Sequence, residues 1–106
     1  MSDICNEYRY IYALRRSKVR LGVLRFLVRV YPRSVPASEI SRKTGYYLSD
    51  VLGALLGGVR YSVDNSLVHL GMAEFLVISN HRLYRATRLG VACLKVICSG
   101  GICGSD

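Results

Sequence analysis

The positions of the apolar residues predict a mostly helical chain. Between Lys18 and Tyr31 they leave only a narrow polar stripe, Ser17 is a typical N-cap, and Pro32 ends the pattern. We expect this helix to be buried on more than one side. Helical spacing also covers Ala37–Lys43, Leu48–Val59 and Arg88–Cys98. In Ile4–Leu14 the tyrosines alternate as in a strand, but they also fit a helical turn, and we interpret this segment as a helix.

The chain between the last two of these helices changes its pattern. "YSVDNS" predicts a turn, and "LVHLGM" predicts continued helical packing up to Gly71, with His69 packed or capping. In "AEFLVISNHRLYRAT", two β-prone runs flank Asn80-His81, which predicts a β-hairpin. Thr87 follows as the N-cap of the last helix. The predicted fold class is mainly α with a small β-hairpin.

The length of 106 residues suits one small domain, which we place at residues 1–98 with its core at 17–94. Residues 99–106, "SGGICGSD", are expected to form a flexible tail. No apolar run is long enough to cross a membrane, and the N-terminus lacks the pattern of a signal peptide. These features predict a cytoplasmic protein with no membrane association.

The charge indicates the class of partner. Lys and Arg number 15 against 7 Asp and Glu, for a formal net charge of +8. A small intracellular domain with this excess favours a polyanion, and DNA or RNA is the first expectation. A charge excess that serves only solubility is the alternative.

The four cysteines leave several interpretations open. Cys93, Cys98 and Cys103 recur every five residues, which matches no common zinc spacing, and Cys5 is far away in the sequence. Buried thiols that act as small hydrophobic side chains are one interpretation, and disulfides are another. A redox switch in this cluster is a hypothesis that rests on the spacing alone.

The sequence shows no motif that predicts catalysis. The sequence offers no nucleophile beside a base, no carboxylate pair, no metal-ligand spacing and no phosphate loop. "LGALLGG" is rich in glycine but lacks the Lys-Ser/Thr of a nucleotide-binding loop. We therefore expect a protein that is not an enzyme and that needs no cofactor or metal.

Four phrases in order resemble the winged helix-turn-helix family, especially small archaeal transcriptional regulators. They are "VRLGVLRFLVRVYP", "VPASEISRKTGYYLSDVLGAL", "SLVHLGMAEFL" and "RLYRATRLGVACL". The resemblance implies a recognition helix at residues 46–57 that enters the major groove of double-stranded DNA, and a wing at 75–86 on phosphates or the minor groove. It also implies a homodimer formed through the N- and C-terminal helices.

The candidate DNA-binding residues flank that helix or lie on the wing. Basic residues would hold phosphates, while hydroxyl groups and a glycine on the helix would approach bases or backbone. The set is Arg42, Lys43, Tyr46, Tyr47, Ser49, Gly53, Arg60, His81, Arg82, Arg85 and Arg88.

The predicted recognition helix departs from the usual chemistry. It contains no Lys or Arg between Gly45 and Val59, so the common arginine–guanine contact is missing. Asp50 can complement the helix dipole or accept from a cytosine amine. Gly53 and Gly57 are expected on one exposed face, where either DNA or a protein helix approaches closely.

That glycine face supports a second hypothesis. In it, the same fold is a protein–protein interaction module without direct DNA readout. RNA binding is a third option, which competition between DNA and RNA duplexes would separate from the first.

Overall fold

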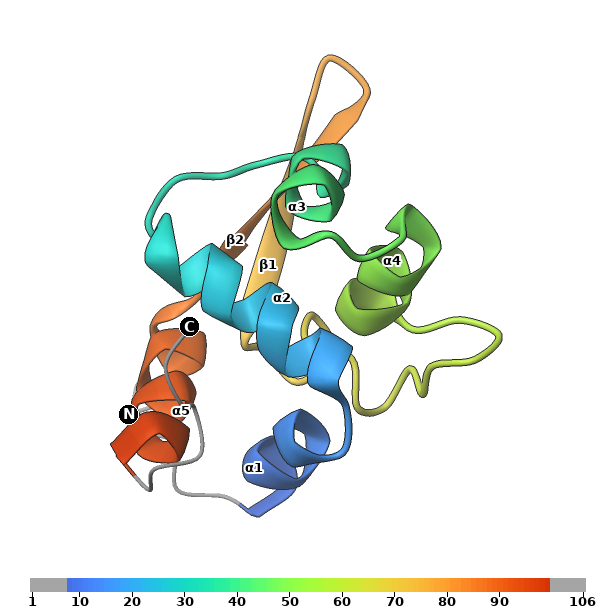
Figure 1. Ribbon diagram of the computed structural model, residues 1–106. Coiled ribbons are helices and arrows are strands. Elements are labelled where there is room, and N and C mark those ends of the chain that lie inside the picture. Colours follow the sequence, from blue (N-terminus) through green and yellow to red (C-terminus); the bar gives the residue numbers. More distant parts are fainter. Residues whose placement is uncertain (1–7, 100–106) are drawn as a thin grey trace.

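The computed structural model describes residues 8–99 and shows a mainly helical protein with one two-stranded antiparallel sheet (Figure 1). This confirms the predicted secondary-structure class. The elements in chain order are α1 (Tyr8–Arg15), α2 (Lys18–Arg29), α3 (Ala37–Thr44), α4 (Leu48–Leu56), β1 (Ala73–Ile78), β2 (His81–Ala86) and α5 (Arg88–Ser99). The predicted tail at 99–106, apart from Ser99 at the end of α5, lies outside the described residues.

Helix α2 runs through the middle of the fold. It contacts α1, α3, α4, α5 and β2 (Figure 1). Its residues Val23, Leu24 and Leu27 are completely buried. The nearly all-round apolar pattern of this helix is therefore explained by packing within one chain, because a helix with neighbours on several sides needs several apolar faces.

Both predicted N-caps are confirmed. The Oγ of Ser17 accepts a hydrogen bond from the backbone N–H of Arg20 at 3.1 Å, and the Oγ1 of Thr87 accepts from that of Gly90 at 3.1 Å. Each bond satisfies a donor that a helix start leaves without an intrahelical partner. Helix α2 ends at Arg29, two residues before the predicted end.

Helix α4 is shorter than predicted. It ends at Leu56 because Gly57 takes a positive φ of 87°, which breaks the helical backbone. Val59, the predicted last residue of the helix, is fully exposed, and Leu48 is also exposed. The buried side of α4 is instead formed by Val51, Gly53, Ala54 and Leu55.

The hairpin turn lies one residue earlier than predicted. Ile78 pairs with His81, and Ser79 and Asn80 form the turn with φ values of 50° and 67°. Two consecutive positive φ angles are typical of a type I′ turn, whose twist matches that of the strands. Asn tolerates a positive φ, which explains why the sequence predicted a hairpin turn here. The predicted turn residues were one position too late in the chain.

A short segment between α2 and α3 extends the sheet. Val35 forms an isolated antiparallel bridge with Tyr84 of β2, with N–H to oxygen distances of 2.8 and 2.7 Å in the two directions. Both side chains are buried. The hairpin is thereby attached to the helical body along β2, on the strand side opposite β1.

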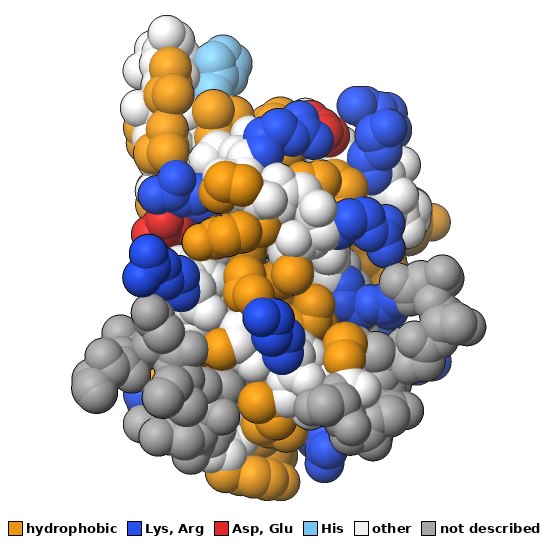
Figure 2. All heavy atoms as spheres, turned by 90° about the vertical axis from the view of Figure 1, so that its left-hand side faces the viewer, with side chains coloured by type: hydrophobic (Ala, Val, Ile, Leu, Met, Phe, Trp, Pro, Cys, Tyr) orange, Lys and Arg blue, Asp and Glu red, His pale blue; other side chains and the backbone are white. Residues whose placement is uncertain are grey.

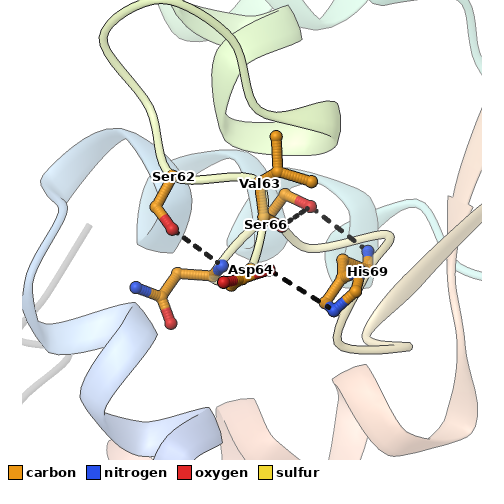
Figure 3. Close-up of polar contacts among 6 residues, drawn as sticks. Ser62, Val63, Asp64, Ser66 and His69 are labelled. Carbon is orange, nitrogen blue, oxygen red and sulfur yellow. Dashed lines mark hydrogen bonds and ion pairs between the residues drawn. The ribbon is translucent and has the colours of Figure 1, made fainter.

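The segment from residue 57 to 72 forms turns, which agrees with the turn predicted for "YSVDNS" but not with the helical packing predicted for "LVHLGM". The N–H groups of Leu67 and Val68 donate to the carbonyls at the end of α4, Ala54 and Leu55, both at 3.0 Å. The Oγ of Ser66 bridges the carbonyl of Val63 and the N–H of His69 (Figure 3).

His69 itself was expected to be packed or capping, and this was wrong. Its ring is exposed and lies 4.0 Å from an Asp64 carboxylate oxygen (Figure 3). The backbone of the turn, not the imidazole, makes the close contacts. An exposed pair at this distance contributes little to stability.

The described cysteines are not free thiols. Cys93 is buried in the core, and both Cys93 and Cys98 are disulfide-bonded. The interpretation of buried free thiols is therefore wrong for these two residues, and the disulfide alternative holds. Cys5 and Cys103 lie outside the described residues. No group of three or more metal-binding side chains occurs between residues 8 and 98.

Candidate nucleic-acid interface

The turn between α3 and α4 is held by its own side chains. Gly45 caps α3 with a φ of 86°, as the sequence predicted. The Oγ of Ser41 donates to the carbonyl of Tyr46 at 2.6 Å, and the Oγ1 of Thr44 accepts from the N–H of the same residue at 3.3 Å. These bonds fix the direction in which the chain enters α4.

The first turn of α4 is the part of this helix that meets solvent. Tyr47, its N-cap residue, is 80% exposed, and Ser49 is exposed next to it. Arg42 and Lys43 are exposed in the last turn of α3, immediately before the Gly45 turn. The structure therefore brings two cations and two hydroxyl-bearing side chains to the same helix–turn–helix segment.

Tyr46 does not belong to that exposed group. Its ring lies against α2 at Gly22, where an added Cβ would come within 2.3 Å of the tyrosine oxygen. Its hydroxyl lies 3.4 Å from the carbonyl of Lys18, and the side chain is half-buried. Tyr46 therefore packs against α2, and a contact of this residue with DNA remains a prediction from the sequence.

Gly53 is a correction, because it is buried rather than exposed. The ring of Tyr61 covers it so closely that an added Cβ would lie 2.3 Å from a ring carbon. Gly57 likewise faces Val63. The chain's own loop after α4 therefore provides the close approach that the glycines permit, and no external helix or DNA backbone is needed to explain them.

Asp50 is engaged by the same loop. Its Oδ1 accepts a hydrogen bond from the hydroxyl of Tyr61 at 3.0 Å and lies 3.5 Å from the guanidinium of Arg60. Burial, followed by this hydrogen bond and the negative charge of Asp50, raises the pKa of Tyr61 above its ordinary value. Asp50 therefore holds the loop to α4, in addition to its place in the first turn of the helix.

The hairpin extends beyond the helices at the top of Figure 1. His81 and Arg82 are exposed near its tip, and the guanidinium carbon of Arg82 lies 4.9 Å from the ring centre of Phe75. This cation–π contact orients the arginine and leaves it charged. Val77 and Ile78 are also exposed near the tip, and as neighbours in β1 they lie on opposite faces of the hairpin.

The remaining candidate cations lie at the base of the hairpin or are paired. Arg85 is half-buried and its Nε lies 2.6 Å from a carboxylate oxygen of Glu74. Arg88 begins α5 and lines a cavity of about 560 Å³ with Arg85 and Glu74. Arg60 follows α4 and is paired with Asp50. Arg60 also lines a pocket with Ser49 at the start of α4, whereas Arg85 and Arg88 line the cavity at the base of the hairpin.

Figure 2 shows that the cations are spread over the face bearing α5 and the hairpin, with apolar side chains between them.

Sequence reasoning missed two residues that shape the site. Tyr61 covers the glycine face, and Arg20 is buried although it is charged. The role of Tyr61 is visible only in its tertiary contact with Gly53. Arg20 lies in a run of apolar residues, and nothing in that run predicted a buried charge.

Comparison with known proteins identifies the family to which the chain belongs. A family model described as EarA-like matches residues 10–97. The chain belongs to the EarA-like family. The uncharacterized protein MJ0905 of Methanocaldococcus jannaschii is 35% identical over 88 residues, which cover 82% of this chain and 79% of that protein. No solved structure gives a significant match.

The matched range spans every element from α1 to α5. Family membership therefore concerns the whole described fold, including the turn before α4 and the hairpin. No helix among the described residues combines the length and apolar character needed to cross a membrane.

Proposed function

We propose that this EarA-like protein is a winged helix-turn-helix regulator of transcription that binds double-stranded DNA. The order helix, helix, tight turn, helix and hairpin supports this fold family. The bridge of Val35 to Tyr84 adds further support, because it supplies a short third strand between the first two helices of the unit. In this assignment α2, α3 and α4 are the three helices and β1–β2 is the wing.

The observation that carries the proposal is the exposed start of α4 beside the cations of α3. Helix α3 contacts both α4 and β2, so the recognition helix and the wing lie on either side of it (Figure 1). A major groove about 12 Å wide accepts one helix, and flanking cations hold the phosphates on its rims. Arg42 and Lys43 would contact phosphates on one rim of the groove, and Arg82 would contact phosphates from the wing.

The chemistry of the contact follows from what α4 lacks. With no cation on α4, Tyr47 and Ser49 are the side chains that would meet bases or phosphates. Hydroxyl groups give modest base discrimination, so phosphate contacts and DNA shape would supply much of the selectivity. His81 at the tip would approach the minor groove.

A homodimer would place two such units on one DNA site. Support comes from apolar side chains left exposed on the terminal helices, namely Tyr8 and Tyr12 of α1 and Val96 of α5. A cytoplasmic location belongs to the same proposal, since chromosomal DNA is the partner.

A protein-interaction module is the second candidate function. The glycine face that first suggested it is covered by Tyr61. Its remaining support is the apolar hairpin, where Phe75, Val77 and Ile78 are all exposed. Exposed apolar side chains on a projecting hairpin are typical of a protein contact.

Binding of a labelled random-sequence DNA duplex, followed by fluorescence anisotropy at several salt concentrations, tests the proposal. Three exposed cations at the helix–turn–helix and wing predict a log–log salt slope of about −3 per protomer. An RNA duplex of the same sequence should compete more weakly. Absence of binding at low salt would overturn the proposal and favour the protein-interaction module.

A further inference from the structure

A polar cavity of about 380 Å³ lies between the α1–α2 junction and the loop after α4. The α1–α2 junction is at the end of the molecule away from the hairpin tip (Figure 1). The cavity receives side chains from both segments, namely Arg16, Ser17 and Arg20 from the junction and Arg60, Ser62 and Asn65 from the loop.

Arg20 is the unusual member of this group. Only 6% of the residue is exposed, and its Nη1 donates to the carbonyl of Ala13 at 3.1 Å. Its Nε is buried and has no hydrogen-bond partner. Burial lowers the pKa of Arg20, and the nearby positive charge of Arg16 lowers it further, while Tyr61 opposes both. An arginine nevertheless stays charged at neutral pH, and among residues 8–99 no carboxylate pairs with this buried cation.

The other groups around the cavity are also suited to an anion. Three of the lining residues are arginines, and none of those that belong to the described part of the chain is Asp or Glu. Ser17 caps α2, so the positive end of that helix dipole points at the same space. The side chains of Ser62 and Asn65 can donate further hydrogen bonds.

The loop that carries half of these groups is held in place. The Oγ of Ser62 accepts from the N–H of Asn65 at 3.3 Å, and Ser66 fastens the following turn through Val63 and His69 (Figure 3). Tyr61, between Arg60 and Ser62, is fixed on α4 by its bond to Asp50. The cavity is therefore formed by well-tethered backbone on both sides.

We propose that this cavity binds the phosphate group of a small phosphorylated molecule. Arginine forks match phosphate oxygens in pairs, and the buried Arg20 would gain the anion that the fold does not supply. The volume falls in the range of roughly 300–1,000 Å³ that is usual for small-molecule sites, so it has room for more than the phosphate alone.

The position of the cavity gives this ligand a route to the proposed recognition helix. Arg60 faces the cavity and also pairs with Asp50 in the first turn of α4. A bound phosphate would compete with Asp50 for that guanidinium. Ligand binding would therefore weaken the Arg60–Asp50 contact, which lies in the loop that packs Tyr61 against Gly53.

Calorimetric titration of the full chain with pyrophosphate tests the proposal without any DNA. We expect saturable binding that weakens by about 10-fold or more in Arg16→Ala and in Arg60→Ala, since each removes a charged hydrogen-bond donor. Both residues are exposed, so the variants should fold, which circular dichroism would check. Arg29→Ala removes the same charge from the far end of α2 and should bind as the unchanged protein does.

Two results would overturn the proposal. One is the absence of saturable binding by pyrophosphate in the unchanged protein. The other is equal binding by the Arg16, Arg60 and Arg29 variants, which would indicate attraction by net charge alone.

DNA is the other possible source of a phosphate at this position. Under the proposal, Arg16→Ala leaves DNA affinity within about 2-fold of the original, an effect below 0.5 kcal/mol. Loss of DNA affinity in this variant, with pyrophosphate displacing DNA, would mean that the cavity holds a DNA phosphate and would overturn the small-molecule assignment. The titration stands independently of whether the protein binds DNA.

Discussion

Glycines that look alike in the sequence have different roles in this fold. Gly45 takes a left-handed conformation with open space around it, so its role lies in the backbone. Gly53 is inside α4 and makes room for the ring of Tyr61. The first role could be predicted from a glycine at the end of a helical pattern. The second could not, because the covering ring comes from a loop that has no helical or strand pattern.

Replacement of Gly53 by alanine tests its burial directly. On an exposed helix face this change should stabilise the protein by about 1 kcal/mol. Beneath Tyr61 it should instead destabilise by about 1–3 kcal/mol, because the ring has to move. Urea unfolding measures the difference, and the double variant with Tyr61→Ala should lose most of the penalty. A more stable Gly53→Ala protein would contradict this packing.

Tyr61 also makes stability depend on alkaline pH. Its pKa is raised in the folded state, so the folded protein holds the phenolic proton more tightly than the unfolded chain does. The resulting stability is fully present below the ordinary tyrosine pKa of about 10 and is lost as pH rises through the folded value. Unfolding curves above pH 9 should therefore fall less steeply with pH in Tyr61→Phe. Parallel pH profiles would argue against the Asp50 contact.

At the scale of elements, the starts of the helices were easier to predict than their ends. Ser17 and Thr87 act locally, and both form the expected bonds. The end of α4 depends on Gly57 meeting Val63, and the hairpin turn depends on strand register. Both depend on contacts between segments, so the pattern of apolar positions placed the end of α4 three residues too late and the hairpin turn one residue too late.

The cap of the central helix gives a prediction of known size. Ser17→Ala should lower the free energy of unfolding by about 1 kcal/mol, because the N–H of Arg20 loses its acceptor. Ser17→Asp should restore most of the loss, since a carboxylate caps as well and complements the helix dipole. Thermal unfolding of the three proteins measures this order. An unchanged midpoint in the alanine variant would contradict the cap.

At the scale of the molecule, the pattern of apolar positions predicted a helical fold with a hairpin but not the pairing of its charges. Arg85 with Glu74 and Arg60 with Asp50 are contacts between separate segments, and they divide a set of cations that looked uniform in the sequence. The apolar pattern predicted that the central helix α2 would be buried on more than one side. Its central position accounts for that apolar surface without a partner.

The proposed dimer consequently depends on α1 and α5. Sedimentation velocity should show a dimer, and Val96→Asp should shift it to monomer, because a charge at an apolar interface is costly to bury. Val59→Asp, at a fully exposed position outside these helices, is the matched control. A monomer at all concentrations tested would contradict this part of the account.

The central claim is that the turn before α4 and the wing hold DNA phosphates. The most direct measurement is DNA affinity by fluorescence anisotropy for Lys43→Ala and Arg82→Ala, with Lys95→Ala on α5 as control. Each of the first two should weaken binding by about 3- to 10-fold and reduce the salt slope by about 1, while the control keeps both values. Equal affinities and slopes for all three variants would contradict the account.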